Sequence, residues 1–233
     1  IQLFGEGVFT PLLESPERAA DHPNPIYRLG ETIQSVLDWG RTYEQENIYT
    51  SSGGVSKPKT QISSVRGGVP YAFGAGTEIC SLYLEVGLPP HVEIGQVHRS
   101  LESHLRQQGI GEFSLEPVVV RHGFAADENR VAPLVSAVDA ATRDTLGEPL
   151  KLAHPVYSSM WRDHNVFNMN RIPAVTTGFP RWRPTPEDMV KSTLIYALTA
   201  LSLCGRAPET ENKKPLSGSD VYGENPFSSA GVS

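Results

Sequence analysis

Two arginines flank a tryptophan between Phe179 and Pro186 (FPRWRPTP), and this segment has the residue types best suited to binding an anion. Arg181 and Arg183 are two residues apart around Trp182. A guanidinium group binds a carboxylate through two parallel hydrogen bonds, so the spacing predicts a loop that holds an anionic substrate. An alternative remains open, in which Trp182 packs on a core and both arginines are solvated.

Other catalytic signatures are missing from the sequence. It contains no Gly-x-Ser-x-Gly elbow, no Walker-type phosphate loop and no dinucleotide fingerprint. Cys80 and Cys204 are too few and too far apart for a disulfide framework or a zinc site, and we expect two buried free thiols in a reducing compartment. The sequence therefore predicts a cytoplasmic protein.

The charge and the apolar runs limit the partners. The net charge of −6 argues against a nucleic-acid surface. The longest apolar run, Leu194 to Cys204, is too short to span a bilayer. We therefore expect no nucleic-acid partner and no membrane partner.

Hydrophobic spacing organises the first half of the chain. Strand-like alternation and helix-like spacing follow one another in the order β-α-β-β-α-β, which predicts one antiparallel sheet under two helices. The first helix is expected to bury Ile26, Leu29, Ile33, Val36 and Leu37, and residues 44–59 are predicted to be a polar connection. The segments are Ile1–Phe4, Pro25–Trp39, Thr60–Val65, Thr77–Val86, a helix from Val92, and Phe113–Val120.

The second half alternates helices with short strands. Two strands cannot form a stable sheet alone, so this half requires a further sheet. Residues 206–233 are rich in Pro, Ser, Gly and Asn and predict an extended or disordered tail. The predicted elements are helices at Val131–Leu146 and Thr185–Cys204, strands at Leu150–Ala153 and Ile172–Thr176, and a turn with a short helix between Ser158 and Asn168.

Several short motifs, taken in order, resemble the zinc-dependent family of aminoacylase, acetylornithine deacetylase, succinyl-diaminopimelate desuccinylase and glutamate carboxypeptidase. Each motif is short, and their order and spacing carry the resemblance over about residues 1 to 205. They are Asn24-Pro25-Ile26, Gly67-Gly68, Cys80 to Glu85 followed by Pro89, Trp161 to His164 with Phe167, Arg171 to Val175 followed by Gly178, and Pro186 to Val190.

The resemblance implies a mixed α+β and α/β fold in three parts. Residues 1–122 would form a ferredoxin-like βαββαβ dimerisation (lid) domain, 123–205 the C-terminal part of an α/β zinc-peptidase catalytic domain, and 206–233 the tail. The N-terminal part of the catalytic domain would be a missing partner segment, and the start at Ile1 is what we expect of a fragment or a processed chain. A homodimer is also implied.

The same resemblance implies a metal-dependent amidohydrolase or peptidase that cleaves an amide bond of an N-acyl amino acid or a small peptide. In that family two zinc ions activate a water molecule. Most ligands would come from the missing segment, so this chain alone is expected to bind no zinc. The alternative is a non-catalytic relative that dimerises or binds a small ligand and has lost the metal centre.

Site residues are carried over one at a time. His22 is the nearest candidate for a family histidine that reaches across the dimer and stabilises the oxyanion, and otherwise it is a surface loop residue. Asn24 either binds substrate or caps the first helix, and capping is favoured. Asp163 matches a family aspartate that supports a metal ligand, although it could instead pair with Arg162 or Arg171.

The sequence departs from the family pattern at two places. Arg183 or Pro184 stands where the family has a metal-binding histidine, and neither side chain can bind zinc, which leaves His164 and His154 as substitutes. Gly87 stands where the family has an arginine that clamps the substrate carboxylate. The remaining candidates for that clamp are Arg66, Arg162, Arg181 and Arg183.

Overall fold

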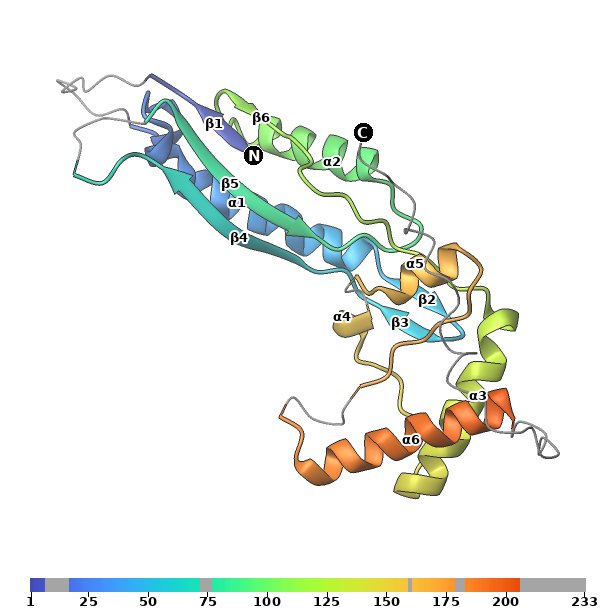
Figure 1. The fold of residues 1–233 in the computed structure, drawn as a ribbon. Helices are drawn as coiled ribbons and strands as arrows, with labels where there is room; N and C mark the ends of the chain where they lie inside the picture. Colours follow the sequence, from blue (N-terminus) through green and yellow to red (C-terminus); the bar gives the residue numbers. More distant parts are fainter. Residues whose placement is uncertain (7–16, 72–76, 159–160, 179–182, 206–233) are drawn as a thin grey trace, which may run out of the picture. The chain divides into compact units, whose positions relative to one another are not determined.

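A computed structural model describes residues 1–6, 17–71, 77–158, 161–178 and 183–205 of the chain, which divides into two compact units (Figure 1). Unit 1 contains Ile1–Ser136 and Pro149–Gly178, and unit 2 contains Ala137–Glu148 and Phe179–Ser233. The secondary structure is mixed α/β, with helices and a small antiparallel sheet. The predicted division at residues 122 and 205 stays a prediction, and the predicted tail lies outside the described residues.

A four-stranded antiparallel sheet organises unit 1. Its strands are β1 (Gln2–Phe4), β4 (Thr60–Gly67), β5 (Ile79–Val86) and β6 (Phe113–Ser114). Their spatial order is β4-β5-β1-β6, and every neighbouring pair is antiparallel. The central pairing places Leu3 of β1 between Cys80 of β5 and Phe113 of β6. The alternating patterns of the sequence therefore predicted these strands, although β6 ends at Ser114 rather than Val120.

Two helices complete this sheet, and side chains fix where each one begins. The Asn24 side chain accepts a hydrogen bond from the Ile26 backbone N–H at 2.9 Å, so α1 (Pro25–Glu46) has the predicted cap. Glu93 and Gln96 form a reciprocal capping box at the start of α2 (Ile94–Gln107). Helix α1 packs against β1, β4, β5 and α2. It continues to Glu46, beyond the predicted end at Trp39.

The core of unit 1 lies between these helices and the sheet. The Trp39 indole N–H donates to the Ser100 hydroxyl at 2.9 Å, which joins α1 to α2, and the Trp39 ring stacks on Tyr43. The buried apolar residues are Leu3, Val36, Trp39, Tyr43, Cys80, Leu82, Val92, Val97, Leu101, Leu105 and Ile110. The apolar positions expected from the helical spacing after Val92 were Val92, Ile94, Val97, Leu101 and Leu105. Ile94 is half-buried and the other four are buried.

The predicted inner face of α1 is partly wrong. Ile26 and Leu37 are exposed, whereas Arg28 and Thr32 are buried. Hydrogen bonds partly offset the burial of these polar side chains: the Arg28 Nη2 atom donates to the Phe4 carbonyl, and the Thr32 hydroxyl donates to the Arg28 carbonyl at 2.9 Å. A prediction based only on apolar residues misses such a face.

A short hairpin replaces the predicted polar connection. Strands β2 (Tyr49–Ser51) and β3 (Gly54–Ser56) pair antiparallel around a two-residue turn. Gly54 has a φ of +117°, a conformation that favours glycine. Each strand is only three residues long and the segment is mostly polar. The sequence therefore showed no alternation of apolar and polar residues long enough to predict a strand.

The second half is helical where it is regular. It contains α3 (Glu128–Leu146), α4 (Pro155–Ser158), α5 (His164–Met169) and α6 (Pro186–Cys204). The strands predicted at residues 150–153 and 172–176 were wrong, since neither segment joins a sheet in the structure as described. A strand requires a neighbour for its backbone hydrogen bonds, and a local sequence pattern does not supply one. The spacing in Val131–Leu146 predicted a buried stripe of Val131, Leu134, Val135, Val138 and Leu146. That stripe is partly wrong, because Val135 is exposed and the buried residues of α3 are Ala137, Val138, Ala141 and Thr142.

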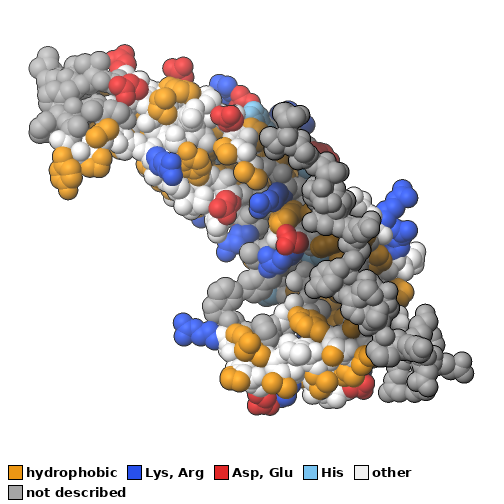
Figure 2. Space-filling model, in the orientation of Figure 1, with side chains coloured by type: hydrophobic (Ala, Val, Ile, Leu, Met, Phe, Trp, Pro, Cys, Tyr) orange, Lys and Arg blue, Asp and Glu red, His pale blue; other side chains and the backbone are white. Residues whose placement is uncertain are grey.

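Helix α6 is well capped but largely uncovered. The Thr185 hydroxyl accepts from the Asp188 backbone N–H at 3.2 Å, and the Asp188 carboxylate accepts from the Thr185 backbone N–H at 2.8 Å. Hydrophobic side chains gather on the exposed surface of this helix (Figure 2), namely Met189, Val190, Leu194, Tyr196, Leu201 and Leu203. Within the described ranges, no helix has the length and apolar content required to cross a membrane.

The two cysteines differ in exposure. Both are free thiols, as predicted, but only Cys80 is buried, and Cys204 is exposed at the last residue of α6. Burial raises the pKa of the Cys80 thiol, and the nearby Arg28 charge partly opposes that rise. The expectation of two buried thiols was therefore wrong for Cys204, because none of the described residues covers it at the end of α6.

Candidate functional site

His22 and Asn24 lie in the turn that leads into α1. The His22 Nδ1 atom accepts a hydrogen bond from the Asn24 backbone N–H at 3.0 Å, and its ring stacks on Tyr27 with centroids 3.9 Å apart. Because Nδ1 is occupied, Nε2 is the ring nitrogen left to meet another group. The turn holds His22 in place, and its proposed role at an oxyanion stays a prediction.

A small pocket of about 470 Å³ surrounds His22 and contains a residue that the sequence reasoning missed. Arg28 lines this pocket and is only 5% exposed. Its Nε atom has no hydrogen-bond partner among the residues that the structure describes. Burial lowers the pKa of Arg28, and the negative charge of Glu112 partly opposes this effect. In the sequence, the one sign of its burial was its position four residues before Thr32, which places both side chains on the same face of the helix.

The pocket is lined by side chains of both charges. Three carboxylates line it, those of Glu6, Asp21 and Glu112. They disfavour a bound anion beside Arg28, although one guanidinium N–H is free. Arg28 instead joins α1 to the end of β1, where a Cβ on Gly5 would come within 2.1 Å of the Pro23 carbonyl oxygen. The pocket therefore fixes the approach of β1 to the turn that carries His22.

Two of the predicted arginines, Arg66 and Arg162, have separate partners. Arg66, in β4, lies over the Tyr83 ring at 5.7 Å from its centroid. Arg162 Nη1 donates to the Trp161 carbonyl at 3.2 Å, and the neighbouring Asp163 is exposed at the start of α5 without a capping bond from its side chain. Arg183 is exposed in unit 2, and Arg181 lies outside the described residues. A shared carboxylate clamp of these residues stays a prediction.

Two histidines were possible metal ligands, and both have other partners. His164 Nδ1 lies 2.6 Å from the Thr176 hydroxyl, and burial, followed by the Arg162 charge, lowers the pKa of His164. His154 Nδ1 accepts from the Val156 backbone N–H at 3.2 Å. In the described part of the chain, no three His, Cys, Asp or Glu residues are grouped as a metal site requires. The zinc expected for the complete enzyme remains untested.

The edge of the sheet at β4 has a free side. Among the strands of the described residues, β4 pairs with β5 alone, and a bulge at Ser63 shifts the register between Ile62 and Ser64. The ladder alternates, so the backbone groups of Ile62 and Val65 point away from β5. At the start of the strand, the Glu44 carboxylate accepts from the Thr60 backbone N–H at 2.7 Å. The open part, Ile62–Gly67, is called the β4 edge below.

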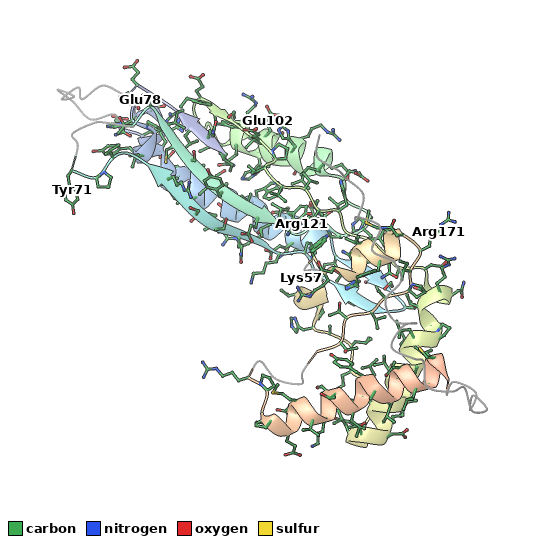
Figure 3. All side chains as sticks on the ribbon, viewed as in Figure 1. Lys57, Tyr71, Glu78, Glu102, Arg121 and Arg171 are labelled. Atoms are coloured by element: carbon green, nitrogen blue, oxygen red, sulfur yellow. The ribbon has the colours of Figure 1, made fainter. Side chains whose placement is uncertain are left out.

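Exposed apolar side chains accompany the β4 edge. Val65 lies within it, and Val69 and Tyr71 follow it; all three are exposed. Tyr71 points away from the sheet beyond the end of β4 (Figure 3) and has a φ of 65°, which is uncommon for a residue other than glycine. An edge with free backbone groups and apolar side chains is suited to pairing with another strand.

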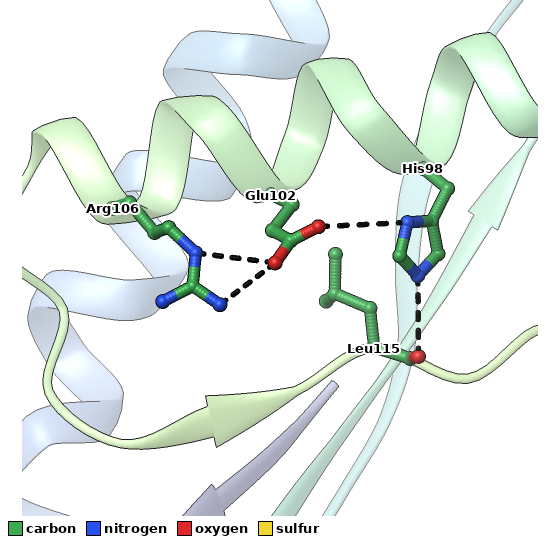
Figure 4. A network of polar contacts seen from close by, with 4 residues as sticks. All are labelled: His98, Glu102, Arg106 and Leu115. Atoms are coloured by element: carbon green, nitrogen blue, oxygen red, sulfur yellow. Dashed lines mark hydrogen bonds and ion pairs between the residues drawn. The ribbon is translucent and has the colours of Figure 1, made fainter.

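A polar network on α2 positions the chain after β6 (Figure 4). His98 Nε2 lies 3.3 Å from the Leu115 carbonyl, and His98 Nδ1 lies 3.8 Å from the Glu102 carboxylate. Arg106 donates to Glu102 at 2.7 Å, and this hydrogen bond is the main reason that the pKa of Glu102 is lowered. The network lies on the outer side of α2 and holds the segment after β6 near that helix.

No model of a known protein family matches this chain. The geometry of unit 1, which contains the sheet and its free edge, is therefore the basis for a functional proposal. The candidate site residues are spread over several elements, whereas the β4 edge is a continuous surface.

Proposed function

We propose that this chain is the lid and C-terminal segment of a metal-dependent amidohydrolase or peptidase that acts on N-acyl amino acids or small peptides. One observation supports this proposal most directly. The order β1-α1-β4-β5-α2-β6, with the strand arrangement β4-β5-β1-β6, is that of a ferredoxin-like lid, interrupted only by the β2–β3 hairpin. This is the arrangement that the resemblance implies for residues 1–122.

The metal centre of such an enzyme requires residues outside this set. The described residues do not fit a zinc site by themselves, since no suitable group of ligands occurs among them. The proposed N-terminal catalytic segment would supply the ligands, and this chain would supply His22 near the reacting carbonyl. His22 is suited to that role, because its backbone contact through Nδ1 fixes the ring and leaves Nε2 directed elsewhere.

Dimerisation is the part of the proposal that this chain can perform alone. Two copies of the β4 edge can pair antiparallel across a two-fold axis, through the outward backbone groups of Ile62 and Val65. The exposed side chains of Val65 and Tyr71 add apolar area to such an interface. The resulting sheet would continue through both copies and leave no free β4 edge.

Solution mass tests this step. The wild-type chain is expected at twice 25.4 kDa by light scattering, because two copies pair. Val65→Pro removes an outward N–H, which an edge strand tolerates, and is expected to give a folded monomer. Val65→Thr keeps the N–H and the β-branched shape and is the matched control. A monomeric wild type, or a dimeric Val65→Pro variant with an unchanged circular dichroism spectrum, would reject pairing through β4.

A second candidate function is a non-catalytic dimerising or ligand-binding relative. The observation that favours it is Arg183-Pro184 at the place of the family's metal-binding histidine, directly before the cap at Thr185. The complete protein encoded by the gene distinguishes the two candidates through its zinc content and its chelator-sensitive hydrolysis of N-acyl amino acids. Zinc-dependent hydrolysis supports the enzyme, whereas a dimer without zinc or hydrolysis supports the relative.

A further inference from the structure

His22 begins the run His22-Pro23-Asn24-Pro25, in which polar side chains alternate with prolines. Proline disfavours the helical conformation of the residue before it, and His22 (φ −72°, ψ 132°) and Asn24 (φ −81°, ψ 116°) are both extended. Neither proline has a backbone N–H, so Asn24 and Ile26 provide the backbone donors that follow His22. The sequence therefore sets the backbone of this turn and leaves two donors that need acceptors.

The side chain two residues earlier accepts from each of these donors. His22 Nδ1 accepts from the Asn24 N–H at 3.0 Å, and Asn24 Oδ1 accepts from the Ile26 N–H at 2.9 Å. Asparagine and aspartate side chains form such bonds in ordinary turns, and here a histidine forms one as well. The pattern recurs at a second His-Pro pair, where His154 Nδ1 accepts from the Val156 N–H at 3.2 Å. The local sequence therefore determines how each histidine is held.

The direction of this hydrogen bond fixes the tautomer of His22. A backbone amide can only donate, so Nδ1 uses its lone pair, and the neutral ring carries its proton on Nε2. The tautomer of His164 is not fixed in this way, because its partner is the Thr176 hydroxyl, which can donate or accept. In the described part of the chain, no acceptor lies within hydrogen-bond distance of Nε2 of His22, although Glu6 and Asp21 line the same pocket.

Tyr27 restricts the plane of the His22 ring. One hydrogen bond at Nδ1 leaves the ring able to tilt, whereas the stacked Tyr27 ring lies 3.9 Å away at 15° between planes. The Tyr27 backbone N–H donates to the Asn24 carbonyl at 3.1 Å, so the stack is joined to the same turn. Tyr27 is 61% exposed and lies outside the core. Its replacement should therefore change the ring position without unfolding unit 1.

We propose that the His22 turn, residues 22–27, presents His22 as a fixed Nε2–H donor to the negatively charged oxygen that forms on the reacting carbonyl. His22 does not act as a base, because its one lone pair is bound to the Asn24 N–H. Tyr27 is a positioning residue, which acts through the His22 ring. A donor that is held in place before the charge develops needs no reorganisation during the reaction. The inference rests on the proposed function, since the reacting carbonyl belongs to it.

Nitrogen NMR of the full chain tests the donor directly. With histidine labelled with nitrogen-15, at about pH 8.5, where an ordinary imidazole is neutral, His22 is expected as a single form with its proton on Nε2. His154 should give the same form and is the internal reference. His22→Asn retains an acceptor for the Asn24 N–H and assigns the His22 signals. A proton on Nδ1, a mixture of both forms, or a bond from Nε2 to Asp21 would overturn the inference.

The kinetics of the complete protein encoded by the gene test the positioning by Tyr27. Tyr27→Leu should lower kcat for an N-acyl amino acid by about tenfold and leave KM within about twofold, because the donor meets a charged oxygen only in the transition state. Tyr27→Phe keeps the stacked ring and should restore kcat. His22→Asn should lower kcat by about a hundredfold. A change in KM alone, or equal losses in Tyr27→Leu and Tyr27→Phe, would reject Tyr27 as a positioning residue.

The two experiments separate this inference from the proposed function. Wild-type complete protein without hydrolysis would reject the proposed function, and with it the oxygen as the acceptor, even where the spectra show the proton on Nε2. Hydrolysis by a protein whose His22 carries its proton on Nδ1 would reject the inference alone.

Discussion

Units 1 and 2 bury their apolar side chains very differently. In unit 1, α1, α2, β1 and β5 contribute buried side chains to one core, and Ile62 of β4 and Phe113 of β6 pack against it. In unit 2, the buried apolar residues are small or short, namely Ala137, Val138 and Ala141, while α6 exposes Leu194 and Leu201. Burial requires facing elements, and in the part of the chain that the structure describes only unit 1 has a sheet with helices packed on it. The free energy of unfolding should therefore depend mostly on unit 1.

The two units begin their helices in the same way, although they differ in how much apolar surface they bury. Asn24 caps α1 in unit 1, and Thr185 caps α6 in unit 2, each through a side-chain oxygen that accepts from a backbone N–H. The same short-range chemistry thus begins a helix over a complete core and a helix with an exposed apolar surface. Substitutions in the two units can separate these contributions.

The largest difference is expected for leucine truncation. Leu105→Ala removes a side chain that is fully buried in unit 1 and should lower the free energy of unfolding by about 2–5 kcal/mol. Leu194→Ala, on the exposed side of α6, should change it by less than about 0.5 kcal/mol. Urea titration followed by circular dichroism measures both variants. Equal losses would mean that α6 is as well covered as α2.

Alkaline pH should act on unit 1 through Tyr43. Its hydroxyl donates to the Gly87 carbonyl at 2.8 Å, and burial raises the pKa of Tyr43 to about 12. An unfolded tyrosine has a pKa of about 10, so the stabilisation is complete below that pH and is lost as the pH rises toward the folded value.

Tyr43→Phe should remove this alkaline loss and should destabilise the protein at neutral pH by about 1 kcal/mol. The exposed Tyr27 provides the control, since Tyr27→Phe should leave the alkaline loss in place. Urea midpoints between pH 7 and pH 12 measure both variants. An unchanged pH profile for Tyr43→Phe would assign the loss to another group.

Removal of either helix cap should cost a similar free energy, but the part of the chain that is destabilised should differ. Asn24→Ala and Thr185→Ala each lose a capping oxygen, at about 1 kcal/mol. The first should lower the urea midpoint of unit 1, whereas the second should speed amide exchange mainly in the first turn of α6. Asn24→Asp and Thr185→Ser retain the oxygen and should restore both readouts. Global destabilisation by Thr185→Ala would show that the units unfold together.

The smallest effect is expected on the surface of α2. Glu102→Gln removes the ion pair with Arg106, and exposed pairs of this kind contribute little. The Arg106 hydrogen bond lowers the pKa of Glu102, so the contribution is present above the pKa of an unfolded glutamate and is lost as the pH falls through the folded value. The melting temperatures of wild type and variant should converge in 1 M salt. A difference that persists in salt would point to the His98–Leu115 contact instead.

The sequence predicted unit 1 better than unit 2 for a physical reason. Alternation in Thr60–Val65 and the helical spacing from Val92 are local patterns with matching partners in the chain, and the structure contains both elements. The strands expected at residues 150–153 and 172–176 carried similar local signals, but a strand also depends on a neighbour that local patterns do not specify.

The candidate site was the least predictable part. Asn24 could be assigned as a cap because capping depends on residues next to it, and the structure confirms that assignment. Arg28 was missed because its burial depends on the Phe4 carbonyl, which lies far away in sequence. The free side of β4 follows from its place at the edge of the sheet. The spacing of residues in the sequence does not specify which strand lies at the edge.

Because the two cysteines differ in burial, their thiols should react with a thiol reagent at very different rates. Cys204 should react with a thiol reagent at once, because it is exposed at the end of α6. Cys80 lies beneath Gly67, where even an added Cβ would come within 3.0 Å of its sulfur, so no reagent reaches it until β4 separates from β5. One thiol therefore reports the total amount of protein, and the rate at which the second appears reports how often the sheet opens.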